Sequence, residues 1–252
     1  MIDRADIMTK AVLLRKELGE DSGSPVDIFS LAQGVENLTL VHYPMGDNLS
    51  GMCVKSADGN CVIAINSAMS LGRQRFSLAH EFYHMRYDDN MMSVCGKVIG
   101  AGKDIEKAAD TFASCFLIPP AELENMAAEL AVGHEDGKLT LDDVIRIEQY
   151  FGVSHQAAVI RLKDSKYMDR SCVEVFLASR VRERACMMGY RPDLYLPLPM
   201  ERRYGTYGRY IEMAEQAFQH DLISGGKYEE LLLDAFRPDL VYGCEDDGEI
   251  AD

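Results

Sequence analysis

Two histidines four residues apart, with a glutamate beside the first, are the residues of this chain best suited to chemistry. His80, Glu81 and His84 stand in the sequence His-Glu-Phe-Tyr-His. Residues four apart lie on one face of an α-helix, so both imidazoles can point at a single ion. Zinc favours imidazole ligands, and this spacing is typical of zinc-binding helices. The sequence therefore predicts a zinc site held by His80 and His84.

Glu81 has a different relation to the expected ion. It follows His80 by one residue, which rotates it by about 100° around the helix. Its carboxylate then lies off the metal but near the open coordination position. A carboxylate placed there can take a proton from water and later give it to the amine that leaves a cleaved peptide bond. We therefore expect Glu81 to be the general base and acid of a peptidase.

A hydrolytic zinc site needs a third protein ligand and an open position. Residues 104–117 are a predicted helix, one face of which carries Glu106, Ala109, Asp110 and Ala113. Two alanines on that face would let this helix approach the histidine helix closely. We expect Glu106 to be the third ligand and Asp110 to accept the free N–H of a ligand histidine. The alternative for Glu106 is an ordinary first-turn acid, which the helix dipole favours.

Short strands and helices must position these residues. Strands are predicted at residues 38–42, 50–55 and 61–66, and Asp58-Gly59 marks a hairpin turn between the last two. A helix over residues 71–87 carries the histidine motif. Residues 88–103 hold three glycines and are expected to form a loop. Further helices are predicted at residues 4–18, 120–130, 140–163 and 204–236.

These motifs resemble the ImmA/IrrE family of zinc metallopeptidases. The resemblance rests on the histidine motif preceded by Arg-Gln-Arg-Phe-Ser-Leu-Ala, and on residues 106–119. The stretches Leu49-Ser-Gly-Met and Ile63-Ala-Ile-Asn also match, so the likeness covers residues 4–165. It implies a small twisted sheet over the zinc helix, with Glu106 at the position of the family's third ligand. It also implies that the substrate is a helix-turn-helix repressor of the XRE type, whose cleavage releases stress-response or mobile-element genes.

The expected fold class is α+β, with a small twisted antiparallel sheet over the zinc helix, followed by helical modules. A zinc metallopeptidase domain is expected over residues 1–137 and a helix-turn-helix-like segment packed on it over 138–170. Residues 171–252 are expected to form a mostly helical extension with an acidic tail, since residues 245–252 hold five acids and no base.

The segment from Leu141 to Leu162 resembles a helix-turn-helix motif, with a glycine-containing turn and a serine cap. Its basic residues, Arg161 and Lys163, stand at the end of the second helix, whereas base-reading residues usually stand at its start. The net charge of −15 also disfavours binding to phosphate backbones. Direct nucleic-acid binding is therefore disfavoured, and a helical pair packed on the peptidase domain is the preferred interpretation.

The composition sets further bounds. The first residues form no apolar signal segment, and no apolar run reaches the length of a membrane span, so we expect a cytoplasmic protein without membrane contact. There are seven cysteines and none stands in a Cys-x-x-Cys pair. We expect most of them to be small buried apolar residues rather than metal ligands.

Two questions stay open from the sequence. The strand at residues 50–55 is either the sheet edge to which a peptide substrate adds or an ordinary internal strand. The side chain that stabilises the oxyanion is also undecided, with four candidates, namely His42, Tyr43, Tyr87 and His134.

The preferred function is a zinc metalloendopeptidase that cleaves an XRE-family repressor and so acts in transcription regulation. The alternative is a regulator without catalysis. Such a protein would bind zinc and sequester its repressor, or would bind DNA through residues 141–163.

Overall fold

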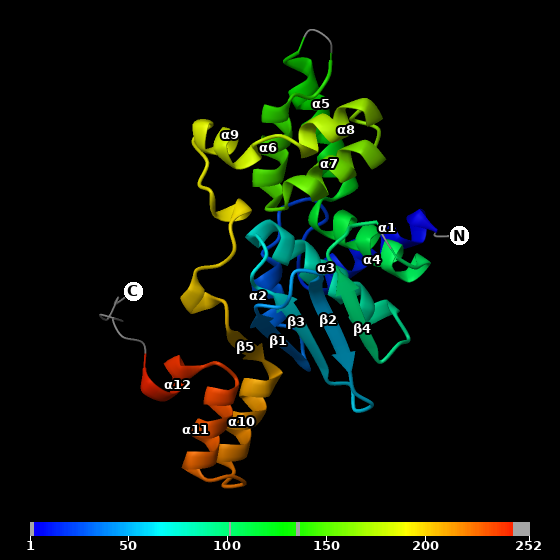
Figure 1. Ribbon diagram of the computed structural model, residues 1–252. Coiled ribbons are helices and arrows are strands. Elements are labelled where there is room, and N and C mark those ends of the chain that lie inside the picture. Colours follow the sequence, from blue (N-terminus) through cyan, green and yellow to red (C-terminus); the bar gives the residue numbers. More distant parts are fainter. Residues whose placement is uncertain (1–2, 101, 135–136, 244–252) are drawn as a thin grey trace.

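A five-stranded sheet and the helices on one of its faces surround the histidine motif (Figure 1). The computed structural model describes residues 3–100, 102–134 and 137–243, so the predicted acidic tail at 245–252 lies outside the described residues. The strands are β1 (Leu38–Tyr43), β2 (Leu49–Lys55), β3 (Cys61–Asn66), β4 (Met92–Gly96) and β5 (Gly205–Gly208). The helices of the first half are α1 (Arg4–Glu17), α2 (Ile28–Gln33), α3 (Leu71–Tyr87) and α4 (Asp104–Leu117). Those of the second half are α5 (Pro120–Val132), α6 (Leu141–Phe151), α7 (His155–Asp164), α8 (Arg170–Leu177), α9 (Val181–Met187), α10 (Arg209–Gln219), α11 (Gly225–Asp234) and α12 (Pro238–Tyr242).

The α+β class is confirmed, but the sheet is mixed and the expectation of an antiparallel sheet is wrong for one pair. The strand order is β4-β2-β3-β1-β5. The β2–β3 hairpin is antiparallel, as its turn predicts, whereas β1 and β3 pair in parallel. The reason is topological: β3 inserts between β1 and β2, which run in opposite directions, so it must be parallel to one of them.

Two strands lie where the sequence predicts none. Strand β4 falls within the expected loop at 88–103 and pairs with β2 at one end of the sheet. Strand β5 falls within the region expected to be two helices and pairs with β1 at the other end. The strand at 50–55 is therefore internal, paired with both β3 and β4, so of the two alternatives left open for it the internal strand is correct and the sheet edge is wrong.

Helix α3 lies between the sheet and α4, which places the histidine motif in the core. Apolar residues of its sheet-facing and α4-facing sides, such as Phe76, Ala79 and Phe82, are at most 2% exposed. On α4, Ala109 and Ala113 are fully buried, so the two helices approach closely as their small side chains predict. Burial of this kind contributes about 1.5–3 kcal/mol for each large apolar side chain.

The helical region from α5 to α9 lies beyond the first turn of α3 (Figure 1). Helices α6 and α7 are separated by Gly152, which has φ +66° and ends α6 in the left-handed conformation. The turn packs directly on α3, since a Cβ atom at Gly72 would lie 2.7 Å from the Ser154 nitrogen. Within the described ranges, no helix has both the length and the apolarity needed to cross a membrane.

Candidate metal centre

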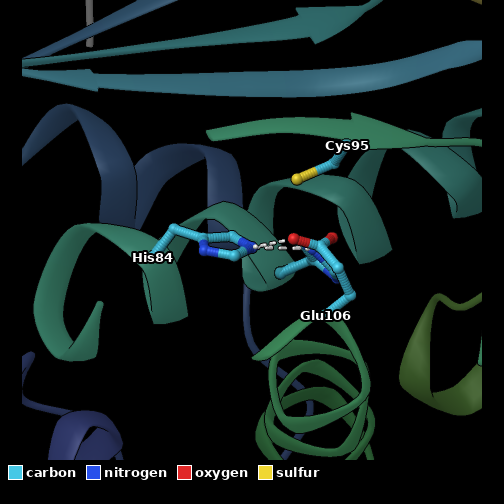
Figure 2. A group of neighbouring side chains, drawn as sticks. His84, Cys95 and Glu106 are labelled. Atoms are coloured by element: carbon cyan, nitrogen blue, oxygen red, sulfur yellow. Dashed lines mark hydrogen bonds and ion pairs between the residues drawn. The ribbon is translucent and has the colours of Figure 1, made fainter. Parts of the chain in front are cut away.

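Three side chains from two helices bring their donor atoms together. His80 and His84 come from α3 and Glu106 comes from α4. The Nε2 atoms of the two histidines lie 3.2 Å apart. The Glu106 carboxylate lies 3.3 Å from His80 Nε2 through Oε2 and 3.6 Å from His84 Nε2 through Oε1. The structure thus brings together the three residues that the sequence predicts as ligands. Figure 2 shows two of them, with the His84 ring pointing toward the Glu106 carboxylate.

These separations fit a zinc ion. Zinc bonds of about 2.0–2.3 Å in a tetrahedral arrangement separate neighbouring ligand atoms by about 3.3–3.7 Å. The three measured distances, from 3.2 to 3.6 Å, lie close to that range. Two imidazoles and a carboxylate are also the donors that zinc takes in hydrolytic sites.

The opposite nitrogen of each histidine is held by an acid. His80 Nδ1 lies 2.8 Å from Asp110 Oδ1, and His84 Nδ1 lies 2.8 Å from Asp88 Oδ2. A carboxylate accepts, so each Nδ1 carries the hydrogen and each neutral ring keeps its lone pair on Nε2. The short Nε2–Nε2 contact then joins two acceptors rather than a donor and an acceptor. Such an arrangement repels unless a cation or a proton lies between the rings, which explains why it suits a metal.

A proton can occupy this position when no cation does. Burial opposes the charged form of His80, but hydrogen bonds to Asp110 and Glu106 outweigh it and raise the pKa of His80 to about 9. The bond to His80 also lowers the pKa of Glu106. The carboxylates around the two histidines therefore favour the binding of a positively charged species between the rings.

Glu81 lies beside the cluster, fully buried beneath β4 and β2. Its Oε2 accepts a hydrogen bond from Ser93 Oγ at 3.3 Å, while Oε1 has no hydrogen-bond partner among the described residues. Burial raises the pKa of Glu81, which favours a carboxyl that can hold a proton. Gly51 of β2 leaves the space that Glu81 occupies, because a Cβ atom there would lie 2.9 Å from Glu81 Oε1.

Cys95 is a fourth candidate ligand that the sequence does not predict. Its Sγ belongs to a group of ligand atoms, with those of His80, His84 and Glu106, that lie within 4.8 Å of one another. Burial, together with the charges of Glu81 and Glu106, raises the pKa of this thiol. Because the chain has no Cys-x-x-Cys pair, the sequence favours buried apolar cysteines over metal ligands. Strand β4, which the sequence also does not predict, places Cys95 beside the cluster.

The surroundings of the cluster differ from one side to the other. His84 is 2% exposed at its side chain, whereas Glu106 is 26% exposed, so solvent meets the cluster on the Glu106 side. A hollow of about 700 Å³ lies at the first turn of α3, lined by Arg73, Ser154 and Tyr195 among others. Because none of the four cluster residues lines it, we do not assign the chemistry to that hollow.

The four oxyanion candidates have their partners outside the cluster. His42 packs against the rings of Phe29 and Tyr207, and burial lowers its pKa to about 4. Tyr43 and Tyr87 pack against other aromatic rings, and His134 lies 2.6 Å from Asp143. The positions of these four residues therefore support none of them as the group that stabilises the oxyanion.

Two histidines on one helix and an acid from a second helix are the ligand arrangement of HExxH metallopeptidases, with the glutamate of the motif beside the metal as general base. The Peptidase M78 family model, described as the IrrE N-terminal-like domain, matches residues 24–163, more than half of the 252 residues. The chain belongs to this family of zinc-dependent peptidases, which confirms the resemblance to ImmA/IrrE proteins. A search of curated proteins finds no match to this chain.

Proposed function

We propose that this protein is a zinc-dependent endopeptidase whose substrate is a helix-turn-helix repressor of the XRE type. The observation that carries the catalytic part is the convergence of His80 Nε2, His84 Nε2 and the Glu106 carboxylate, with both Nδ1 atoms bonded to acids. Membership of a zinc-dependent peptidase family supports the same reaction. The repressor as substrate rests on the resemblance to ImmA/IrrE proteins.

Each residue of the cluster has a separate task in this reaction. His80, His84 and Glu106 would hold the zinc ion, which when bound supplies a Lewis acid that acidifies water and polarises the scissile carbonyl. Asp110 and Asp88 fix the ring orientation of the two histidines. Glu81 takes the proton of the attacking water at its carboxylate and passes it to the leaving amine. Burial of Glu81 raises its pKa and so favours the protonated form that the second step needs.

The position of β4 supports a peptide substrate. In the part of the chain that the structure describes, β4 pairs on one side with β2 and ends the sheet on the other. An extended peptide can add to such an edge through backbone hydrogen bonds. Since Ser93 of β4 contacts Glu81, a peptide along this strand would run beside the catalytic residues.

The positions of the α7 side chains do not favour DNA reading. His155, the first residue of α7, is buried and bonded to Glu148. Arg161 is 9% exposed and donates to the Ile118 carbonyl at 3.3 Å. The start of this helix exposes one polar side chain, that of Gln156, whereas recognition helices usually read bases with several. We therefore assign α6 and α7 to docking of the repressor rather than to contact with its operator.

The test is cleavage of a co-encoded XRE-type repressor by zinc-loaded protein, followed on a gel. The wild-type protein should give defined fragments. Glu81→Gln should bind one equivalent of zinc and cleave about 10²–10⁴-fold more slowly, because the amide cannot carry the proton. The matched control is Glu129→Gln on the exposed side of α5, which should cleave like the wild type.

Cleavage by Glu81→Gln at the wild-type rate would contradict this mechanism. An intact repressor that loses DNA binding in stoichiometric mixture with zinc-loaded wild-type protein would support sequestration without catalysis.

A further inference from the structure

We propose that Cys95 is a fourth protein ligand of the metal and that its thiolate closes the coordination position needed for hydrolysis. The resting protein would then be a latent peptidase, opened when Cys95 leaves the metal. This inference rests on the proposed zinc site. It concerns the regulation of that site, because two histidines and a glutamate can bind the metal without Cys95.

The placement of Cys95 follows from the pleat of β4. Side chains alternate between the two faces of a strand, so Ser93 and Cys95 point to the same side. Ser93 contacts Glu81 of α3, which identifies this side as the one facing the metal cluster. Cys95 lies opposite Gly51 in the ladder and is 2% exposed. Figure 2 shows its sulfur pointing from the strand toward His84 and Glu106.

The donor set with Cys95 is that of a closed site. Its sulfur, the two Nε2 atoms and a Glu106 oxygen all lie within 4.8 Å of one another, so one ion can reach all four after small movements. Thiolate is a strong zinc donor, at about 2.3 Å, and four protein donors complete a tetrahedron. Binding replaces the S–H bond of Cys95 by a sulfur–metal bond and releases the proton to solvent. No position then remains for water.

The environment of Glu81 is an independent sign of a closed site. Glu81 is fully buried, and its Oε1 has no hydrogen-bond partner among the described residues. A buried carboxylate oxygen without a partner is costly unless something enters beside it. The strand that carries Cys95 also covers Glu81, through Ser93. Displacement of this part of β4 would therefore free the metal position and give water access to the general base together.

Strand β4 is suited to such a displacement. It spans five residues and, among the described residues, is held in the sheet by β2 alone. The outward side chains Met92 and Val94 are 61% and 46% exposed, so they add little packing that would resist movement. A peptide that pairs with the edge of β4 would act on the strand that holds the inhibitory thiolate.

Cobalt substitution tests this ligand directly. Co²⁺ added to the metal-free wild-type protein should give the near-ultraviolet sulfur-to-cobalt charge-transfer absorption together with intense visible bands of a tetrahedral ion. Cys95→Ser and Cys95→Ala should bind one equivalent of Co²⁺ without the charge-transfer band. The matched control is Cys53→Ala, another buried cysteine on the neighbouring strand β2, which should keep the band.

Zinc affinity and cleavage give two further readouts. The zinc dissociation constant should rise about tenfold or more in Cys95→Ala, since even supporting residues around a metal contribute about 10–100-fold to affinity. Cleavage of the repressor by the zinc-loaded Cys95 variants should be faster than by the wild type. Equal affinity and an equal or slower rate in both folded variants would overturn the inhibitory role.

The outcomes separate this inference from the proposed function. A wild-type protein that binds one Co²⁺ without the charge-transfer band would overturn the role of Cys95 and leave the three-ligand site intact. Cobalt binding that survives His84→Ala unchanged would instead overturn the proposed zinc site. The first measurement uses the wild-type chain, so it decides the question even if a Cys95 variant fails to fold.

Discussion

His80 and His84 on α3 and His155 on α7 are all buried histidines bonded to acids, but they use their second ring nitrogen differently. His155 bonds to Glu148 through Nδ1 at 2.8 Å and to the Phe176 carbonyl through Nε2 at 2.9 Å. Both of its nitrogens have acceptors, so the ring is complete without a ligand. In the α3–α4 cluster the second nitrogens face each other as acceptors. The comparison indicates that the convergence of two Nε2 atoms on each other and on one acid, rather than burial or acid contacts alone, distinguishes a metal site from a structural histidine.

The largest expected effect on zinc binding and cleavage comes from a histidine-to-glutamine substitution in the metal cluster, compared with the same substitution at the structural histidine His155. His84→Gln should remove stoichiometric zinc and abolish cleavage, because an amide is a poor zinc ligand. His155→Gln should keep one zinc per chain and lose only stability, by about 1–3 kcal/mol, because a buried hydrogen-bond partner of Glu148 is altered. Zinc content measured by mass spectrometry and urea unfolding distinguish the two. Loss of zinc in both variants would contradict the difference between the metal cluster and the structural histidine.

Gly51→Ala tests how closely the sheet is fitted to the general base. The added Cβ would lie 2.9 Å from Glu81 Oε1 and 3.1 Å from the Ala64 carbonyl, so β2 or Glu81 must shift. A displacement of about 1 Å at a reacting group can reduce the rate about 10²-fold. Cleavage should fall by that order while zinc affinity stays near wild type.

Gly46→Ala is the control for this substitution, since nothing lies within 4 Å of its added Cβ. Unchanged cleavage by Gly51→Ala would show that Glu81 does not need its present position.

Asp110→Asn weakens the support of one ligand histidine without removing a ligand. Asp110 accepts from His80 Nδ1 and from the Gly100 nitrogen, and an amide lacks the charge that stabilises the histidine N–H. We expect zinc affinity to fall about 10–100-fold, with cleavage retained at saturating zinc. Competition with a chromophoric chelator measures this change. An affinity equal to the wild type would mean that Asp110 holds the fold and not the ligand.

The smallest expected effect is the pH dependence of the structural site. Burial lowers the pKa of His155, but the bond to Glu148 outweighs it and the pKa is raised overall. A raised folded-state pKa contributes stability that is complete below the unfolded value of about 6.5 and is lost as pH rises through the folded value. The free energy of unfolding should therefore decrease over that range more in the wild type than in His155→Gln. Parallel pH profiles for the two proteins would contradict the assignment.

The sequence predicts the helical half of the site well and the sheet half poorly. The helical period places His80, His84, Glu106 and Asp110 by itself, because spacing along a helix fixes direction. Cys95 and Gly51 depend on a five-residue edge strand and on its pairing with β2, which only tertiary structure determines. Asp88 stands four residues after His84, a spacing that could have revealed the pair, but it directly follows the last residue of α3 and falls in the expected loop at 88–103.

The parallel pair in the sheet could not be predicted for a similar reason, because it also depends on tertiary structure. The three strands from 38 to 66 are predicted where they occur, but the insertion of β3 between β1 and β2 leaves no mark on their hydrophobic pattern. Strand β5 is four residues long and lies among Tyr204, Tyr207 and Tyr210, whose spacing of three residues also suits a helix, so the local pattern favours the wrong element there.

Anomalous diffraction at the zinc absorption edge, from crystals grown with zinc, tests the central claim most directly. The three-ligand site predicts one strong peak within about 2.0–2.3 Å of His80 Nε2, His84 Nε2 and a Glu106 oxygen. A peak at any other position would contradict the three-ligand site. So would the absence of a peak between α3 and α4 in crystals grown with saturating zinc.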